Sequence, residues 1–536
     1  MVFARTGSVA LVGVEGVVVE VQADLEPGVA AFTLVGLPDK SLFESRDRVR
    51  AALVNSGETW PQKKLTVGLS PASVPKSGSG FDLAVACAVL AAAERIDPAA
   101  IADLMLIGEL GLDGRVRPVR GVLPAVLAAA DAGYRQVVVP ERTAAEASLV
   151  PGVSVLGVRT LRQLIAVLND EPVPDEPRDD EEGRPDPLGA ALTVPGLAAA
   201  GPGRDIGPAL DLADVAGQHT ARHALEIAAA GGHHLHLCGP PGAGKTMLAE
   251  RLPGLLPPLS AKEALEVTAI HSVAGVLPPG KPLIDTPPYY APHHSATMPA
   301  LVGGGSGLPR PGACSLAHNG VLFLDEAPEF PSRVLEALRQ PLESGHVVVA
   351  RAAGVMRLPA RFLLVLASNP CPCGRHGMAA GGCDCTPSAV RRYQGRLSGP
   401  LMDRVDLRVT AEAVSRAQLA GAGRQESSAE VAVRVREARD RAAARYRELP
   451  WHTNSQVPGH ELRTRWQLAP GALRDVEREM ERGLLTARGL DRVLRVAWTV
   501  ADLAGHDRPD ADDLAHALHL RTGVHRGVPV PAGSAP

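Results

Sequence analysis

The apolar residues in the first third of this chain form two kinds of segment, one typical of strands and one typical of helices. Residues 16–21 and 64–69 are short runs rich in valine and leucine, which predict β-strands, whereas residues 81–93 are apolar over a longer stretch and predict a buried helix. Residues 1–21 as a whole also alternate in the manner of a strand. Because strands and Ala/Leu-rich helices follow one another in this way, we expect a compact α/β domain over residues 1–168.

A change in composition marks the end of this domain. Residues 170–182 are acidic and rich in proline. Such a segment has too few apolar side chains to form a core, and its prolines and like charges keep it extended. We therefore predict a flexible linker over residues 169–205.

Strand and helix patterns resume after the linker. Residues 234–238 and 362–367 are apolar runs of strand length, and residues 247–252 have the composition of a helix. They predict a second α/β domain over residues 206–410.

The remaining residues, 411–536, are predicted to be helical. Ser427 and Glu430 have the spacing of a capping box, and residues 472–503 carry apolar side chains at helical intervals. The helix that starts after Ser427 is rich in arginine. This pattern is more often a solvated surface than a DNA-binding one.

Composition and charge limit the function classes. The chain has 536 residues, of which 45% are hydrophobic, so it is long enough for three globular domains. Its formal net charge is only −4, so any contact with nucleic acid must be local to a groove or pore. No apolar run approaches the roughly 18 residues of a membrane-spanning helix, and the first residues do not form a signal peptide. We expect a cytoplasmic protein.

The most informative motif is a glycine-rich loop between a predicted strand and a predicted helix. It is Gly239-Pro240-Pro241-Gly242-Ala243-Gly244-Lys245-Thr246, a complete Walker A sequence. In such a loop, backbone N–H groups converge on phosphates, the lysine reaches the outer phosphates and the threonine hydroxyl binds Mg²⁺. Gly and Pro clusters are usually simple turns, but the flanking strand and helix favour a site for ATP.

A second motif lies about eighty residues further on. The apolar residues 321–324 lead into Asp325 and Glu326, the pattern of a Walker B strand. Asp325 would hold Mg²⁺ through water, and Glu326 would orient the attacking water, so two adjacent carboxylates serve two tasks. The alternative is a strand that merely leaves the core. Together the two motifs predict an enzyme that hydrolyses ATP.

Four of the seven cysteines are crowded into one segment. They form two C-x-C pairs, Cys371 with Cys373 and Cys383 with Cys385. Four thiolates are enough for a tetrahedral, structural Zn²⁺, although the spacing is tighter than in common zinc ribbons. The alternative is four reduced thiols in a glycine-rich surface loop. The other three cysteines, in apolar surroundings, are expected to be small buried side chains: Cys87, Cys238 and Cys314.

Further short motifs, taken in order, resemble one family, the magnesium-chelatase-like AAA+ ATPases of the YifB/ComM type. They are residues 35–39, 78–83, 292–295, 316–320, 369–374, 398–404 and 487–489. The resemblance covers nearly the whole chain. It implies a homo-oligomeric, hexameric ring that couples ATP hydrolysis to translocation on DNA and to branch migration in recombination.

The resemblance also implies roles for three polar residues of the site. Asn369, at the end of a predicted strand, matches the sensor-1 position and should lie beside Asp325. Arg404 resembles the arginine finger that a neighbouring subunit inserts, and Arg488 resembles the sensor-2 arginine of the lid. The planar cation of Arg404 would stabilise the charge that develops on the transferred phosphoryl group, and Arg488 would report the nucleotide state to the helical domain.

Two segments are implied to face a central pore. Residues 346–351 and 355–358 flank a short turn and predict a hairpin. It resembles the presensor-1 hairpin of MCM helicases, which places Arg351 where a basic residue would contact DNA. Residues 292–305 resemble the helix-2 insertion of the same group of ATPases.

The first domain resembles the Lon protease fold but lacks its catalytic pair. Gly80 stands where the nucleophilic serine is expected, and Ala125 stands where the lysine is expected. Ser79 is one position away, but no partner lysine follows. Without a nucleophile and a base, peptide hydrolysis is excluded, and we interpret this domain as a catalytically dead platform for assembly or nucleic-acid binding.

Two rival functions remain open. A chelatase-type motor would remodel a partner protein during metal insertion, but the chain has no D-x-S-x-S motif. A protein unfoldase would need aromatic pore loops, and aromatic residues make up only 3% of the chain, with Tyr289-Tyr290 as the sole candidate pair.

Overall fold

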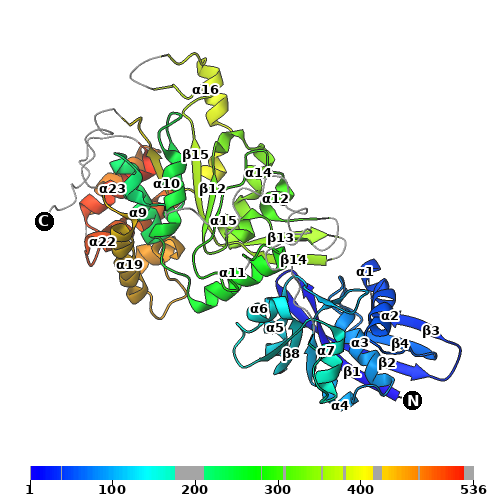
Figure 1. Ribbon diagram of the computed structural model, residues 1–536. Helices are drawn as coiled ribbons and strands as arrows, with labels where there is room; N and C mark the ends of the chain where they lie inside the picture. Colours follow the sequence, from blue (N-terminus) through cyan, green and yellow to red (C-terminus); the bar gives the residue numbers. More distant parts are fainter. Residues whose placement is uncertain are drawn as a thin grey trace.

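The computed structural model describes residues 2–175, 210–414 and 425–523, apart from residues 38, 279, 306–308, 352–353, 378–381, 467 and 469–470. The predicted linker therefore lies largely outside the described residues. Figure 1 shows the first domain, coloured blue to cyan, beside a larger body that contains the second sheet and the C-terminal helices. Both sheets combine with helices, which confirms the predicted α/β fold class.

The first domain contains a seven-stranded sheet in the order β3-β4-β2-β1-β5-β8-β9. The predicted strand at the start of the chain is in fact a long hairpin, in which Val2 pairs with Leu25 and Val12 with Glu15. Helix α3 packs on this hairpin, and every one of its residues is buried, as the continuous apolar run predicted. The strands are β1 (Val2–Val12), β2 (Glu15–Glu26), β3 (Ala31–Val35), β4 (Lys64–Ser70), β5 (Leu104–Leu106), β8 (Gln136–Pro140) and β9 (Ser154–Val158).

Short elements complete this domain. Two of them, β6 (Glu109–Leu110) and β7 (Val116–Arg117), form a separate small hairpin. The helices are α1 (Lys40–Phe43), α2 (Ser45–Asn55), α3 (Asp82–Ala92), α4 (Pro98–Ile101), α5 (Val122–Asp131), α6 (Ala144–Ala147) and α7 (Leu161–Leu168).

The second sheet is parallel, with the order β11-β12-β15-β10-β16. Strands β12 and β15 are buried over their whole length, which explains why the sequence shows continuous apolar runs there rather than alternation. Strand β10 alternates between buried and half-buried residues. Its strands are β10 (Leu235–Cys238), β11 (Tyr289–Tyr290), β12 (Val321–Leu324), β15 (Leu363–Ser368) and β16 (Leu407–Thr410). Because the carboxyl ends of parallel strands meet at one edge, the segments that follow β10, β12 and β15 are brought together.

Helices and one hairpin surround this sheet. The predicted hairpin is confirmed as β13 (His346–Arg351) paired with β14 (Gly354–Pro359). The helices are α9 (His219–Gly231), α10 (Lys245–Arg251), α11 (Ala261–Ala274), α12 (Met298–Val302), α13 (Ala313–Leu316), α14 (Ser332–Ala337), α15 (Arg339–Ser344), α16 (Pro387–Gln394) and α17 (Gly399–Met402).

The C-terminal residues form a helical domain. The predicted capping box is confirmed, since Ser427 and Glu430 exchange hydrogen bonds at the start of α19. Residues 472–503 form two helices rather than one, with Gly483 in a left-handed conformation (φ 70°) between them. The helices are α19 (Ser428–Arg445), α20 (Gly459–Thr464), α21 (Arg474–Glu481), α22 (Ala487–Ala504) and α23 (Ala511–Thr522).

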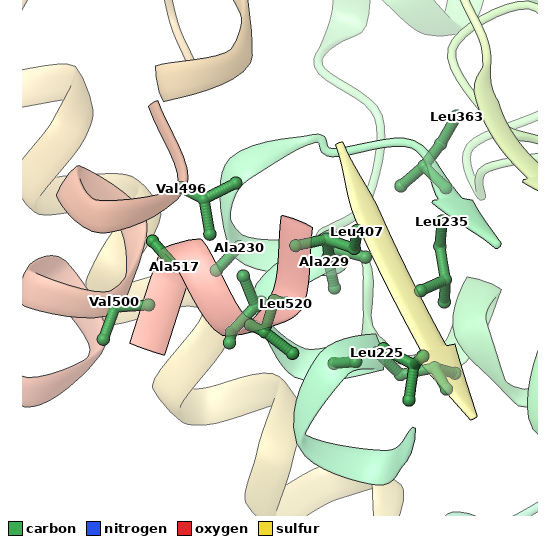
Figure 2. Packing of buried hydrophobic residues seen from close by; sticks show 14 of the residues in the cluster. Leu225, Ala229, Ala230, Leu235, Leu363, Leu407, Val496, Val500, Ala517 and Leu520 are labelled. Carbon is green, nitrogen blue, oxygen red and sulfur yellow. The ribbon is translucent and has the colours of Figure 1, made fainter. Parts of the chain in front are cut away.

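One apolar cluster joins this helical domain to the second sheet. Figure 2 shows Val496 and Val500 of α22 and Leu520 of α23 close to Leu407 of β16 and Ala229 of α9. All five side chains are at most 8% exposed. The helical domain and the edge of the sheet therefore share a continuous core.

The first domain also packs directly on the second. Ala269 of α11 lies in the same apolar cluster as Val122 and Ala125 of α5. The buried carboxylate of Glu146 accepts hydrogen bonds from the backbone N–H of Leu123, at 2.9 Å, and from the hydroxyl of Ser272 in α11. Burial raises the pKa of Glu146, because the carboxylate is removed from water.

A second contact between the domains involves the turn of the first hairpin. Gly13 packs so closely on β14 that a Cβ atom at this position would lie 2.8 Å from Cγ of Met356. In Figure 1, the β1–β2 turn accordingly lies beside the β13–β14 hairpin. The first domain thus touches both helix α11 of the second domain and the hairpin that the family resemblance implies to face a pore.

Among the residues that the structure describes, no helix combines the length and the apolar character that crossing a membrane requires.

Candidate nucleotide-binding site

The Walker A loop connects β10 to α10. Gly242 and Gly244 have left-handed backbones (φ 77° and 81°), a conformation that side chains with a Cβ rarely adopt. Gly239 is required for a different reason, because a Cβ there would lie 2.2 Å from the carbonyl oxygen of Ala411. The glycines therefore both shape the loop and let it approach the chain that follows β16.

Lys245 lies at the centre of the site. Its Nζ donates hydrogen bonds to the carbonyl oxygens of Gly239 (2.7 Å) and Pro240 (2.9 Å) and to Oδ1 of Asn369 (3.1 Å). Burial lowers the pKa of Lys245, and the nearby carboxylate of Asp325 opposes this shift. The lysine thus links the Walker A loop to the end of β15, where the sequence placed sensor 1.

The two Walker motifs meet through a threonine and a carboxylate. Oγ1 of Thr246 donates to Oδ2 of Asp325 at 2.7 Å, and the other carboxylate oxygen accepts the backbone N–H of Glu326 at 2.9 Å. A hydroxyl beside a carboxylate is the kind of oxygen donor set that Mg²⁺ prefers. These residues therefore fit the predicted Mg²⁺ site.

Glu326 has an unusual backbone. Its φ is 49°, in the left-handed region that a residue with a side chain occupies at a cost on the order of 1–3 kcal/mol. Its side chain is 52% exposed, next to Asp325. The two consecutive carboxylates have different neighbours, since Asp325 contacts Thr246 and Glu326 lies near His294. This separation suits the two roles predicted for them.

His294 is a neighbour of the site that the sequence did not predict. Its Nδ1 lies 3.4 Å from Oε2 of Glu326, although 31 residues separate the two in the chain. The sequence placed His294 only within the segment 292–305, expected to face a pore. No spacing rule could have revealed this contact, because it depends on how the segment folds back over the end of β12.

Arg404 and Arg488 lie elsewhere. Arg404 precedes β16, whereas the Walker A loop follows the adjacent parallel strand β10. Arg404 therefore lies at the amino-terminal ends of the strands, and the Walker A loop lies at their carboxyl-terminal ends. The Arg404 guanidinium contacts Glu343 at 3.0 Å and the carbonyl oxygen of Pro400 at 2.8 Å. Arg488 is 76% exposed and lies 4.0 Å from Asp403. The two arginines therefore share one edge of the molecule.

Arg351 pairs with Gly354 at the end of the hairpin, so Gly354, which the sequence placed in the turn, belongs to β14. The side chain of Arg351 and residues 352–353 lie outside the described residues. In the segment 292–305, α12 forms a short helix, and the ring of His293 lies against the ring of His294, with 4.0 Å between centroids. The contact of either segment with a pore stays a prediction.

The four clustered cysteines do come together. The Sγ atom of Cys371 lies 3.3 Å from that of Cys373 and 3.8 Å from that of Cys383. With Cys385, all four sulfur atoms lie within 4.8 Å of one another. This close approach is the arrangement that tetrahedral zinc coordination requires. Of the remaining cysteines, Cys87 and Cys314 are fully buried as predicted, and Cys238 is half-buried.

The residues compared with the Lon catalytic pair have the following surroundings. The Ser79 hydroxyl donates to the carboxylate of Glu109, and the amine of the neighbouring Lys76 donates to the carbonyl oxygen of Pro71. Ala125, at the position expected for the catalytic lysine, is 3% exposed within α5. That the first domain is catalytically dead stays a prediction.

Fold and site together define a class of protein. A parallel sheet carries a phosphate-binding loop, a carboxylate pair and a polar amide at neighbouring strand ends, and a helical domain packs beside the sheet. This is the architecture of an AAA+ ATPase.

Comparisons with known proteins identify the family within this class. Three family models match: magnesium chelatase, subunit ChlI, over residues 211–419; subunit ChlI of Mg-chelatase over residues 21–143; and the ChlI C-terminal model over residues 425–521. The chain belongs to the YifB/ComM-type family of magnesium-chelatase-like proteins.

Relatives support this assignment over nearly the full length. An uncharacterized protein of Mycobacterium tuberculosis is 52% identical over 98% of this chain and 100% of its own length. Competence protein ComM of Haemophilus influenzae is 39% identical over 98% of both chains, and YifB of Escherichia coli is 38% identical over 96% of this chain and 95% of that protein. Lon protease 1 of Thermus thermophilus is 30% identical over 143 residues, 25% of this chain and 18% of its own.

The contacts of Lys245 and Glu326 lead to separable expectations. Lys245→Ala should abolish ATP binding, because the loop loses the cation that faces the phosphates. Glu326→Gln should still bind ATP but hydrolyse it about 100-fold more slowly or worse, since the amide cannot serve as a base. Fluorescent-nucleotide binding and phosphate release measure the two effects. Lys281→Ala, which removes an exposed lysine paired with Asp285, should change neither. Normal turnover in Glu326→Gln would contradict the assignment.

Proposed function

We propose that this protein is a ring-forming AAA+ ATPase, hexameric in its working state, that couples ATP hydrolysis to translocation on DNA and to branch migration during recombination. The observation that carries the proposal is the separation of the site into two halves. The phosphate-binding residues lie at one edge of the sheet, and the arginines predicted to act on the phosphates lie at the other. A second copy of the chain is needed to bring the halves together.

The first half contains the groups that would bind ATP and Mg²⁺. Lys245 and the backbone N–H groups of the loop would hold the triphosphate, and Thr246 with Asp325 would hold the metal ion. Bound Mg²⁺ neutralises phosphate charge. Glu326 would accept the proton of the attacking water, and Asn369, already bonded to Lys245 at 3.1 Å, would orient that water or an outer phosphate oxygen.

The second half would come from the neighbouring subunit. Strand β16 has four residues and is therefore about 13 Å long, so Arg404, which precedes it, lies too far from its own Walker A loop to act there. Its 11% exposure reflects the ion pair with Glu343, which would have to open when Arg404 reaches a phosphate. Arg488, on the same edge and highly exposed, would act beside it in the partner's site.

Mixing two inactive variants tests the shared site. Arg404→Ala should bind ATP without hydrolysing it, and Lys245→Ala should not bind it. In a mixture of equal parts, about one quarter of the interfaces join an intact loop to an intact Arg404, so about a quarter of the wild-type rate should return. The rate of phosphate release measures this recovery.

Arg478→Ala is a suitable control, because it removes an exposed arginine that pairs with Asp475 in α21. That variant should keep full activity alone. A mixture that stays inactive, or an Arg404→Ala protein that turns over normally, would overturn the shared site.

DNA is the proposed substrate because of the hairpin and the relatives. The β13–β14 hairpin ends at Arg351, and a relative with 39% identity is named a competence protein. The rival function as an unfoldase is disfavoured because its candidate pore-loop pair, Tyr289-Tyr290, is buried. Tyr290 is 3% exposed, and both tyrosine hydroxyls are buried in the edge strand β11. Aromatic side chains packed in a sheet cannot grip a polypeptide in a pore.

Steady-state ATPase activity tests the substrate. We expect single-stranded or branched DNA to stimulate hydrolysis, with Glu326→Gln protein as the blank, and Arg351→Ala to keep basal activity but lose the stimulation. Arg357→Ala is the matched control: it lies three positions from the turn on the same hairpin, beside His346. Full stimulation of Arg351→Ala would remove the hairpin from the mechanism. Hydrolysis indifferent to every DNA would instead favour a motor that remodels a partner protein, including one of the chelatase type.

We also propose that the four-cysteine cluster holds one structural Zn²⁺. Four sulfur atoms from two C-x-C pairs lie within 4.8 Å of one another, and Cys371 is fully buried beside the backbone of His376. Thiolates crowded in this way would repel one another unless a cation or protons neutralised them.

Metal analysis of the purified protein should find about one zinc ion per chain. The double variant Cys373→Ser/Cys385→Ser should lose it, because hydroxyls are poor zinc ligands. Cys87→Ala, which changes a buried cysteine of α3 in the other domain, should retain the full zinc content. A wild-type protein free of zinc after purification without chelators would refute the site.

A further inference from the structure

The cysteine loop lies directly against the Walker A loop. Gly374, between the two C-x-C pairs, has a left-handed backbone (φ 77°), and a Cβ at this position would lie 2.4 Å from Cδ and 2.7 Å from Cγ of Pro241. The backbone N–H of Gly374 donates to the carbonyl oxygen of Cys371 at 2.9 Å, which closes a tight turn. The turn at Gly374 therefore packs closely against Pro241, the second proline of the Walker A loop.

The same loop is fixed at both ends. Two residues before Cys371, the side chain of Asn369 bonds to Lys245. The carbonyl oxygen of Pro370 accepts a hydrogen bond from Nε2 of Gln394, at the end of α16, at 3.0 Å. Helix α16 itself begins two residues after Cys385. The cysteine segment is therefore joined to Lys245 by the hydrogen bond of Asn369, two residues upstream, and to Pro241 by the close packing of Gly374.

We propose that the four-cysteine loop is a metal-held brace that positions the Walker A loop for ATP. Gly374 acts through Pro241: it is a positioning residue that fixes where the loop's N–H groups point. A loop ordered before the ligand arrives loses less conformational entropy on binding, so bracing increases affinity for the phosphates. This inference rests in part on the proposed zinc site, because the metal would hold the turn rigid.

The predicted consequence is a link between metal content and ATP affinity. Loss of the metal frees the turn at Gly374, the contact with Pro241 loosens, and ATP binds more weakly. The carboxylates of Asp325 and Glu326, which follow β12, are not in the loop that is freed. The maximal rate at saturating ATP should therefore change much less than the KM.

Two glycines of the same loop provide a matched test. Gly374 and Gly377 have nearly equal backbone angles (φ 77° and 78°), but a Cβ at Gly377 meets no atom within 4 Å among the residues that the structure describes. Gly374→Ala and Gly377→Ala thus impose the same backbone strain, and only the first collides with Pro241. We expect Gly374→Ala to raise the Kd and KM for ATP about 10- to 100-fold, with kcat at saturation and zinc content kept. Gly377→Ala should match the wild type.

A compensating variant distinguishes the proposed collision with Pro241 from a general folding defect. Pro241→Ala removes Cγ and Cδ, the two ring atoms closest to the added methyl group. The double variant Gly374→Ala/Pro241→Ala should therefore bind ATP more tightly than Gly374→Ala alone, a coupling that misfolding would not produce. Equal ATP affinity in Gly374→Ala and Gly377→Ala, or a double variant that is no better than Gly374→Ala, would overturn the brace.

Metal removal tests the second part of the inference. Full-length protein is stripped with a chelator, desalted, and assayed for ATP binding with excess Mg²⁺, before and after zinc is added back. A rise in the Kd for ATP that zinc reverses supports a metal-held brace, and an unchanged Kd overturns the role of the metal. If the protein holds no zinc but Gly374→Ala alone weakens binding, the zinc site fails and the contact between the loops stands.

Discussion

The parallel register of β12, β15 and β10 is the constraint on which the site depends. Val321 pairs with Leu363, and Leu235 with Val365. Strands β10 and β15 therefore end level with one another, and β12 ends two residues earlier. Their carboxyl ends deliver the carboxylate pair, the amide of Asn369 and the Walker A loop to one edge. A slip of one residue would turn each strand's side chains over and separate Thr246 from Asp325. The apolar side chains that fill both faces of these strands thus determine the geometry of the polar site.

Helix α5 of the first domain contributes to the packing between the two domains. Helix α5 carries Ala125 where a Lon-type enzyme would need its lysine, and the same helix packs on α11 of the ATPase core. A lysine amine at this buried position would have to be removed from water against an apolar surface, at a cost of several kcal/mol. Packing between the domains and a catalytic lysine are therefore hard to combine at this position.

Local sequence determined much of what could be predicted. The strands, the buried helix α3, the hairpin, the capping box and both Walker motifs depend on neighbours in the chain, and the structure contains them all. What could not be predicted depends on sheet order and loop packing. The contact of His294 with Glu326 and that of Gly374 with Pro241 join residues 32 and 133 positions apart, and no periodic pattern encodes either. The location of Arg404 opposite the Walker A loop follows only once β16 is known to pair with β10 in parallel.

The apolar cluster shared by α22, α23 and β16 determines how the helical domain can move. A lid joined to its core by a short hinge can swing alone, but here Val496 and Leu520 are packed with Leu407 in one interior (Figure 2). Asp403 ties the two parts further, since it contacts both Arg521 of α23 and Arg488. The edge that carries Arg404 and Arg488 is therefore stiff. In the proposed ring, a tilt of one subunit would move both arginines together into or out of the neighbouring nucleotide site. The state of each site would then depend on the orientation of the adjacent subunit rather than on a movement of the helical domain within one chain.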